Sequence, residues 1–306
     1  MSTRIISKRF GVAAEPVRSG TRRTPAKPPL QLCPAEELHG IRKLPANLQD
    51  AYRAIAEDAR YAHFVRIPLR LIKCIDYFGI TCHRTVARDR LLSFYLFIGV
   101  VDQVLDSAQI EIGQVILGFF ENRAPGFTEA LDGGDVRLVT EVLKSNISEE
   151  SYQLIKTKLG RLYGRVLRER AAESMAEHIR CRQAVGALTA DVSYLLIEPC
   201  FERTNKSLLR FMKRVGAVGC LIDSLIDLGS DRSLGLLRFT PAIKDYRQLI
   251  QRLVALGLRL LFDHPHLSPL FLQAAKDDFL DRFGRRRHLN AETSVADRKE
   301  AIARVV

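Results

Sequence analysis

The sequence predicts an all-α protein, a single-domain helical bundle that follows a disordered, basic N-terminal tail. Apolar residues recur with a helical period almost throughout the chain after Pro45. Glycine and proline fall between the periodic segments, and no alternating strand pattern of convincing length is present. Residues 1–45 contain six of the twelve prolines and have no clear period. We therefore divide the chain into a disordered basic segment, residues 1–45, and an α-helical domain, residues 46–306.

Nine helices are expected in this domain, and two of them begin at a recognisable cap. Thr240–Pro241 and Ser268–Pro269 each place an N-cap hydroxyl before a proline that suits the first helical turn. The segment 149–193 is long enough to be interrupted, and a break is expected near Gly164 or Gly186. The expected helices cover residues 47–63, 66–80, 86–120, 135–145, 149–193, 205–230, 241–262, 268–284 and 294–304.

Composition and charge exclude several classes of protein. Apolar residues make up 47% and charged residues 27% of the chain, which is ordinary for a globular protein. The longest apolar stretch, residues 91–101, ends at Asp102 and is too short to cross a bilayer, so no transmembrane segment is expected. The net charge is +12, but no basic stripe with interleaved aromatic residues is present, so nucleic acid is not an expected partner.

Positive charge is concentrated towards the ends of the chain. Residues 1–30 hold seven Arg or Lys against Glu15 alone, and Arg285–Arg287 form a second cluster. Such ends are typical of solvated, flexible tails, and they would also suit peripheral contact with an anionic membrane. No feature of the sequence indicates an oligomeric state.

Cysteine usage and the N-terminus favour a cytoplasmic protein. The six cysteines are scattered without a CxxC pair, which is typical of reduced, buried thiols. The N-terminus lacks the apolar core of a secretory signal. It is rich in arginine and nearly free of acids, as an organellar transit peptide would also be, so composition leaves both locations open.

Two expected helices carry aspartates four residues apart in sequence that is otherwise apolar and uncharged. Asp223, Asp227 and Asp231 lie in VGCLIDSLIDLGSD, and Asp102 and Asp106 lie in LLSFYLFIGVVDQVLDSAQI. At this spacing each set shares one face of its helix. A single pair of this kind is typical of a solvated or ion-paired face, but two sets on apolar helices favour a shared site.

Small residues, Gly216, Gly219 and Cys220, lie on the aspartate face of the second helix and would leave space beside the carboxylates. Like charges four apart destabilise a helix, and burial adds several kcal/mol per ion. Neither aspartate segment contains Lys or Arg, so we expect a cation from outside. Oxygen ligands on helices suit Mg²⁺. The His/Cys cluster of a zinc site and the Glu-x-x-His motifs of a di-iron bundle are absent from the sequence.

These residues resemble the class I terpenoid synthases, an all-α superfamily in which two acidic helices face each other across a cavity. Asp102 and Asp106 look like the first Asp-rich motif, and Asp223, Asp227 and Asp231 look like the second metal motif. The string VGCLIDSLIDLGSDRSLGLLRF is most similar to bacterial large-terpene synthases of the tetraprenyl-β-curcumene type, and its spacing also fits squalene and phytoene synthases. The resemblance covers roughly residues 85–240.

The chain departs from the family pattern at several positions. The first motif lacks an adjacent Asp–Asp doublet and has Leu105 where relatives often keep an acid. Gly229 and Ser230 also occupy positions where acids are usual.

The resemblance implies a Mg²⁺-dependent terpene synthase, a carbon–oxygen lyase of isoprenoid biosynthesis. It would ionise a long-chain prenyl diphosphate and release diphosphate, with the five aspartates as metal ligands and catalytic residues. Arg232, and Arg180 or Arg182 on the preceding helix, are the candidates for binding the diphosphate. Tyr95 is the best-placed aromatic residue for a cation-lined cavity. Head-to-head prenyl condensation and a non-enzymatic helical protein derived from a synthase remain open as alternatives.

Overall fold

The described part of the chain is all-α, as expected. The computed structural model describes residues 46–58, 60–106, 112–121, 134–274 and 276. Within these ranges no strand occurs, and the only bridge pairs Cys82 with Phe201. The expected tail, residues 1–45, and the expected helix 294–304 lie outside the described residues.

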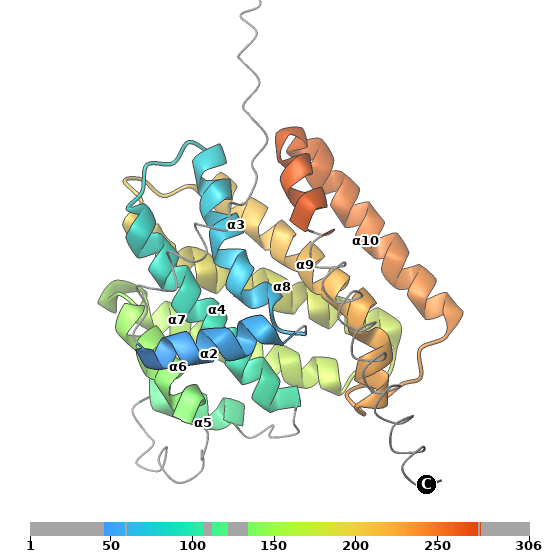
Figure 1. Ribbon diagram of the computed structural model, residues 1–306. Helices are drawn as coiled ribbons and strands as arrows, with labels where there is room; N and C mark the ends of the chain where they lie inside the picture. The colour runs from blue at the N-terminus through green and yellow to red at the C-terminus, as the bar shows by residue number, and fades with distance from the viewer. Residues whose placement is uncertain (1–45, 59, 107–111, 122–133, 275, 277–306) are drawn as a thin grey trace, which may run out of the picture.

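Nine α-helices and two 3₁₀ turns make up the described fold (Figure 1). They are α2 (Ala46–Glu57), α3 (His63–Tyr77), α4 (Arg84–Asp106), α5 (Ile112–Phe120), α6 (Gly134–Asn146), α7 (Glu149–Arg170), α8 (Met175–Ile197), η1 (Glu198–Cys200), α9 (Lys206–Ser233), α10 (Ile243–Asp263) and η2 (Pro265–Leu267). The expected helix 86–120 corresponds to α4 and α5, and residues 107–111 between them lie outside the described residues. Helical residues also resume at Ser268, where a cap was expected.

The expected long helix 149–193 breaks between Arg170 and Met175, at neither of the expected glycines. Ser174 is the N-cap of α8, and its side chain accepts a hydrogen bond of 3.4 Å from the backbone N–H of Glu177. This is the Ser-x-x-Glu signature of a helix start. The start of α10 also differs, because Ala242 is its N-cap, and the carboxylate of Asp245 accepts from the Ala242 N–H at 2.8 Å.

Helices α8 and α9 cross at the centre of the molecule in direct backbone contact (Figure 1). A Cβ atom added at Gly216 would lie 2.2 Å from the carbonyl oxygen of Gly186, and one at Gly186 would lie 2.0 Å from that of Gly216. Glycine is therefore required at both positions. Gly216, expected to leave space beside the carboxylates, serves mainly to let the two backbones approach.

Two apolar clusters hold the bundle together. The larger one draws side chains from every helix from α2 to α10, and its fully buried side chains include Phe94, Tyr194 and Phe211. The smaller one packs α10 against α8 and α9 through Leu249 and Leu228. In the described ranges, none of the helices combines the length and hydrophobicity that crossing a bilayer requires.

Candidate functional site

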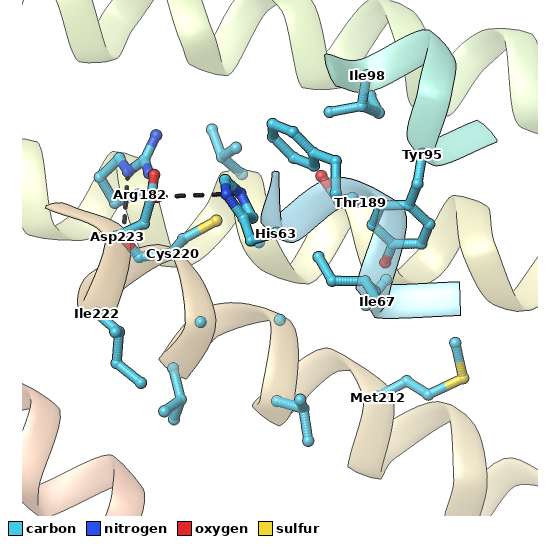
Figure 2. A pocket seen from close by; sticks show the side chains of 18 of the residues that line it. His63, Ile67, Tyr95, Ile98, Arg182, Thr189, Met212, Cys220, Ile222 and Asp223 are labelled. Carbon is cyan, nitrogen blue, oxygen red and sulfur yellow. Dashed lines mark hydrogen bonds and ion pairs between the residues drawn. The ribbon is translucent and has the colours of Figure 1, made fainter. Parts of the chain in front are cut away.

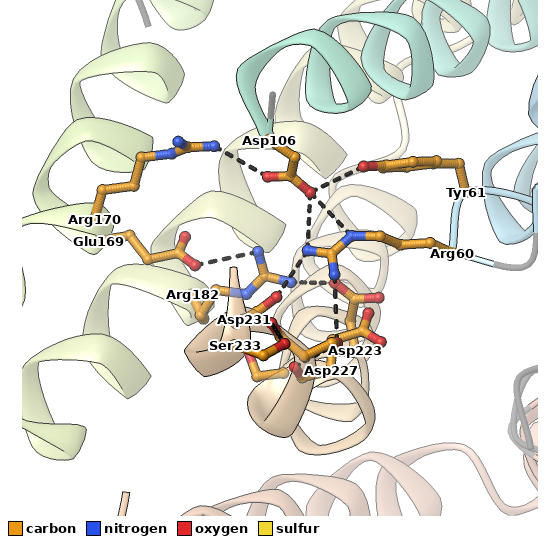
Figure 3. A network of polar contacts seen from close by, with 12 residues as sticks. Arg60, Tyr61, Asp106, Glu169, Arg170, Arg182, Asp223, Asp227, Asp231 and Ser233 are labelled. Atoms are coloured by element: carbon orange, nitrogen blue, oxygen red, sulfur yellow. Dashed lines mark hydrogen bonds and ion pairs between the residues drawn. The ribbon is translucent and has the colours of Figure 1, made fainter. Parts of the chain in front are cut away.

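The two acidic helices meet at one polar network, shown in Figure 3. Arg60, in the connection between α2 and α3, reaches both of them. Its Nε donates to Asp106 Oδ2 at 2.9 Å, and its Nη2 donates to Asp231 Oδ1 at 2.7 Å. The backbone N–H of Arg60 is itself held by the Asp58 carboxylate at 2.8 Å. One arginine side chain therefore links the end of α4 to the end of α9.

Asp106, the last residue of α4, accepts hydrogen bonds from three side chains. Besides Arg60, the hydroxyl of Tyr61 donates to Oδ2 at 3.0 Å, and Nη2 of Arg170 donates to Oδ1 at 3.0 Å. Arg170 is the last residue of α7, where a cation also interacts favourably with the helix dipole. Both oxygens of this carboxylate are engaged, and its side chain is only 13% exposed.

Arg182 of α8 neutralises the other part of the cluster. It donates to the Asp223 carboxylate through Nη2, to Glu169 Oε1 at 3.4 Å through Nη1, and to the Cys220 carbonyl at 3.3 Å through Nε. His63 Nε2 lies 4.0 Å from Asp223 Oδ1. Asp223 is thus approached from α8 and from the start of α3.

Burial and neighbouring charges shift the pKa values of these groups. Burial opposes the charge of Arg60, but Asp106, Asp231 and Asp227 outweigh it and raise the pKa of the guanidinium. Burial and the charge of Asp106 hold the pKa of Asp102 well above its usual range. Burial also raises the pKa of Glu169 and of Asp231, against the opposing effect of their arginine partners. The cluster therefore holds more negative charge than its environment readily accommodates.

The structure places the predicted residues as follows. Asp106 and Asp231 are both bonded to Arg60, and Asp223 pairs with Arg182. Asp227 is buried, with only 6% of its surface exposed. Burial raises the pKa of Asp102, which also lies close enough to Asp106 and Asp223 for their charges to raise it further. Of the three candidate arginines, Arg182 belongs to the network, whereas the side chains of Arg180 and Arg232 are exposed. The other guanidinium groups of the network come from Arg60 and Arg170.

In this structure the charge that the aspartates need comes from arginines outside the two acidic helices, namely Arg170 of α7, Arg182 of α8 and Arg60 of the connection between α2 and α3. Sequence reasoning looked for basic partners only at Arg232 and on the helix before the second acidic segment, so it named Arg182 but missed Arg60, Arg170 and Glu169. The break after α7, signalled by Ser174-x-x-Glu177, could have placed Glu169 and Arg170 at a helix end. No local pattern marks Arg60.

The acidic cluster has the donor chemistry of a magnesium site without a preformed cage. Its side chains offer only carboxylate oxygens, which Mg²⁺ prefers. Among the described residues, however, no three carboxylate, His or Cys side chains converge closely enough to hold a metal ion. Mg²⁺ commonly uses one or two carboxylates together with phosphate oxygens, so the donor set fits an ion that arrives with a phosphorylated ligand.

An apolar cavity of about 560 Å³ opens from the acidic cluster. Figure 2 shows Arg182, Asp223 and His63 at one end and Tyr95, Ile67 and Met212 towards the other. Asp102 also lines the cavity, as do Gly219 and Cys220 of α9. An added Cβ at Gly219 would meet nothing within 4 Å, so here a small residue does leave open space.

Tyr95 contributes its ring to this cavity, as its position on the Asp102 face suggested. Its hydroxyl accepts a hydrogen bond of 3.1 Å from Ser193 Oγ, and the side chain is buried. The cavity therefore has a charged end and an apolar, partly aromatic body. Such a shape suits an elongated ligand with an anionic head and a hydrocarbon chain.

No protein-family model, curated protein or solved structure matches the chain.

Proposed function

We propose that the protein is a Mg²⁺-dependent class I terpene synthase, which ionises a prenyl diphosphate and releases diphosphate to form a hydrocarbon. The position of Asp102 and Asp223 carries the proposal. These carboxylates come from α4 and α9, two helices far apart in sequence, and both line the apolar cavity of about 560 Å³. A metal-bound diphosphate at the acidic end would leave its prenyl chain in the apolar body.

The arginines of the network would bind the diphosphate. Arg60 and Arg182 each hold carboxylates, and a guanidinium binds phosphate oxygens in the same two-point manner. When the diphosphate enters, we propose that these arginines exchange a carboxylate oxygen for a phosphate oxygen. The carboxylates of Asp102, Asp106, Asp223, Asp227 and Asp231 would then be available as metal ligands.

Bound Mg²⁺ would neutralise the negative charge that develops on the departing diphosphate. The protein's own contribution is to orient the diphosphate with Arg60 and Arg182 and to keep water away from the chain. The apolar cavity wall serves the second purpose, because a carbocation formed there meets few nucleophiles. The face of the Tyr95 ring would stabilise the positive charge.

A non-enzymatic helical protein derived from a synthase is the second candidate. The extent of ion pairing favours it, because Asp106, Asp223 and Asp231 all have arginine partners from within the chain. A structural network of this kind would hold the helix ends together and perform no chemistry.

A turnover assay distinguishes the proposed enzyme from a non-enzymatic protein. The protein would be incubated with geranyl, farnesyl, geranylgeranyl and longer prenyl diphosphates, with Mg²⁺ or with EDTA, and diphosphate release measured beside mass spectrometry of the products. We expect release only with Mg²⁺. A product with the carbon number of one substrate indicates a terpene synthase, and a product with twice that number indicates head-to-head condensation. No release from any substrate contradicts the proposal.

Asp227→Asn tests the role of the cluster in that assay. The change removes charge and keeps volume, so we expect release to be abolished. Loss of this charge relieves its repulsion with Asp223 and Asp231 on the same helix face, so we expect the unfolding free energy without Mg²⁺ to be unchanged or to rise. Asp135→Asn, at an exposed aspartate of α6, is the matched control and should retain full turnover. A loss of about 3–5 kcal/mol with surviving turnover would make Asp227 a structural partner.

A further inference from the structure

The outer face of α10 is apolar and exposed. Of the nine large apolar residues that are exposed in the described part of the chain, six lie between residues 243 and 272, so exposed apolar surface is concentrated here. Phe262 is 80% and Ile243 is 76% exposed. The full set is Ile243, Ile250, Val254, Leu258 and Phe262 of α10, with Leu272 of the segment that follows; we name it the α10 face.

This face is separate from the face by which α10 joins the bundle. Leu249 and Leu260 are buried on the inner side. Ile250, Val254 and Leu258 follow one another at four-residue spacing and so share the opposite side. Figure 1 shows α10 along the outer edge of the molecule, beside α9. A surface helix normally carries polar residues at such positions, so a second apolar side indicates a binding surface.

The α10 face is continuous with the cavity. Val254, Leu258 and Leu272 are each about half exposed or more, and each also lines the cavity. These three residues form part of the cavity rim. A hydrocarbon chain could therefore move between the α10 face and the cavity along apolar side chains.

Basic residues accompany the apolar ones. Lys244, Arg247 and Arg259 are exposed on α10. The two acids of the helix are engaged elsewhere, since Asp245 caps the first turn and Asp263 pairs with Arg214. The helix therefore presents apolar and cationic side chains together, which is the composition of helices that lie in the interface of an anionic membrane.

We propose that the α10 face docks on an anionic lipid bilayer, so that a lipophilic ligand passes between the membrane and the cavity. Apolar side chains would enter the boundary between headgroups and acyl chains, and Lys244, Arg247 and Arg259 would contact lipid phosphates. A second copy of the chain is a poorer occupant, because a two-fold interface would bring these like charges together. The proposal goes beyond the reaction proposed above and holds for any lipophilic ligand of the cavity.

Vesicle sedimentation of the full chain tests this docking. With phosphatidylcholine vesicles we expect little binding, and with added phosphatidylglycerol we expect binding that weakens at high salt. Ile243→Asp with Phe262→Asp changes two exposed side chains that do not line the cavity. This double variant should bind at least about tenfold more weakly. Lys244→Glu with Arg247→Glu should lose about 30-fold or more.

The matched control lies on α7, where Leu154 is 48% exposed and Arg161 is also exposed. Leu154→Asp with Arg161→Glu should bind like the parent protein, and circular dichroism would establish that every variant is folded. Equal binding by parent and α10 variants would assign binding to the basic tails and overturn the proposal. So would a dimer, seen by sedimentation velocity, that the α10 variants dissociate.

Discussion

Arg60 links the ends of the two acidic helices within the charged cluster. Its guanidinium bonds to Asp106 of α4 and Asp231 of α9, while the aspartates on each helix repel one another. The side chain is 24% exposed, so water screens these charges only in part. The apo protein therefore needs Arg60 to keep the ends of α4 and α9 together.

Arg60→Ala should destabilise the protein without metal by about 3–5 kcal/mol, because the Asp231 carboxylate loses its guanidinium partner and Asp106 keeps only Arg170 and Tyr61. Urea unfolding in EDTA measures this. Arg53→Ala removes a pair that is 60% and 75% exposed and should cost under about 1 kcal/mol. If the carboxylates can hold Mg²⁺, the metal should stabilise Arg60→Ala more than the parent. A variant as stable as the parent in EDTA would contradict the structural role of Arg60.

His178 makes stability depend on pH. It is buried beside Phe239, and neither ring nitrogen has a hydrogen-bond partner among the described residues. Burial, and secondarily the charge of Arg182, lower the pKa of His178 to about 3. The unfolded chain takes up this proton near pH 6.5 and the folded chain does not. The unfolded state thus binds more protons between these values, and stability is lost as pH falls below about 6.5.

His178→Leu should remove this acid sensitivity. Between pH 8 and pH 5 the unfolding free energy of the parent should fall by about 2 kcal/mol more than that of the variant. This is because pH 5 lies about 1.5 units below the pKa of the histidine in the unfolded chain, and each unit contributes about 1.4 kcal/mol. Denaturant unfolding at both pH values measures the difference. His83→Leu, at an exposed histidine, should show no such gain. An equal effect of pH on parent and His178→Leu would mean that His178 is protonated in the folded protein.

At the scale of elements, the crossing of α8 and α9 positions the site. The crossing brings the Arg182 side of α8 against the Asp223 side of α9. Contact between the backbones at Gly186 and Gly216 leaves no room for a side chain. The distance between these helices therefore follows from two glycines that carry no chemistry of their own.

Gly216→Ala should separate the helices and destabilise the protein by about 3 kcal/mol, because the new methyl group overlaps a backbone carbonyl. Gly219→Ala is the matched control on the same helix, where an added Cβ meets nothing within 4 Å. There the better helix propensity of alanine should leave stability unchanged or raise it by up to about 1 kcal/mol. Thermal unfolding of both variants measures this. Similar losses for the two would show that the close crossing is absent in solution.

At the scale of the whole molecule, the site carries a charge opposite to that of the chain. The net charge of the protein is +12, whereas the cluster sets six carboxylates, the five aspartates and Glu169, against the guanidinium groups of Arg60, Arg170 and Arg182. The surplus of carboxylates would repel a diphosphate that arrives alone, and a divalent cation would reduce this repulsion.

Mg²⁺ and inorganic diphosphate together should therefore raise the melting temperature more than the sum of their separate effects. Binding at about 100 times Kd stabilises by about 2.7 kcal/mol, which is a shift of several degrees for a chain of this size. Differential scanning fluorimetry measures the shift, and EDTA should reverse it. Diphosphate that stabilises equally with EDTA present would contradict a metal-dependent site.

The sequence by itself determined the features that depend on neighbouring residues. Helical periodicity predicted the all-α class and most helix positions, since burial of one helix face is a local pattern. The same spacing placed Asp223 and Asp227 on one face of α9. The break between α7 and α8 was not predicted, although the Ser-x-x-Glu pattern at Ser174 that marks it is local. The predicted break was placed at glycines instead.

Only the tertiary structure decided which groups neutralise the aspartates and what lies beside them. Arg60 bonds to residues 46 and 171 positions away, and no spacing rule connects side chains at such separations. The role of Gly216 likewise depends on Gly186 of another helix. A carboxylate needs a countercharge wherever the fold buries it, but the chain can supply that charge from any element that passes close by. Sequence therefore shows where charge is buried, and the packing of the helices selects its partner.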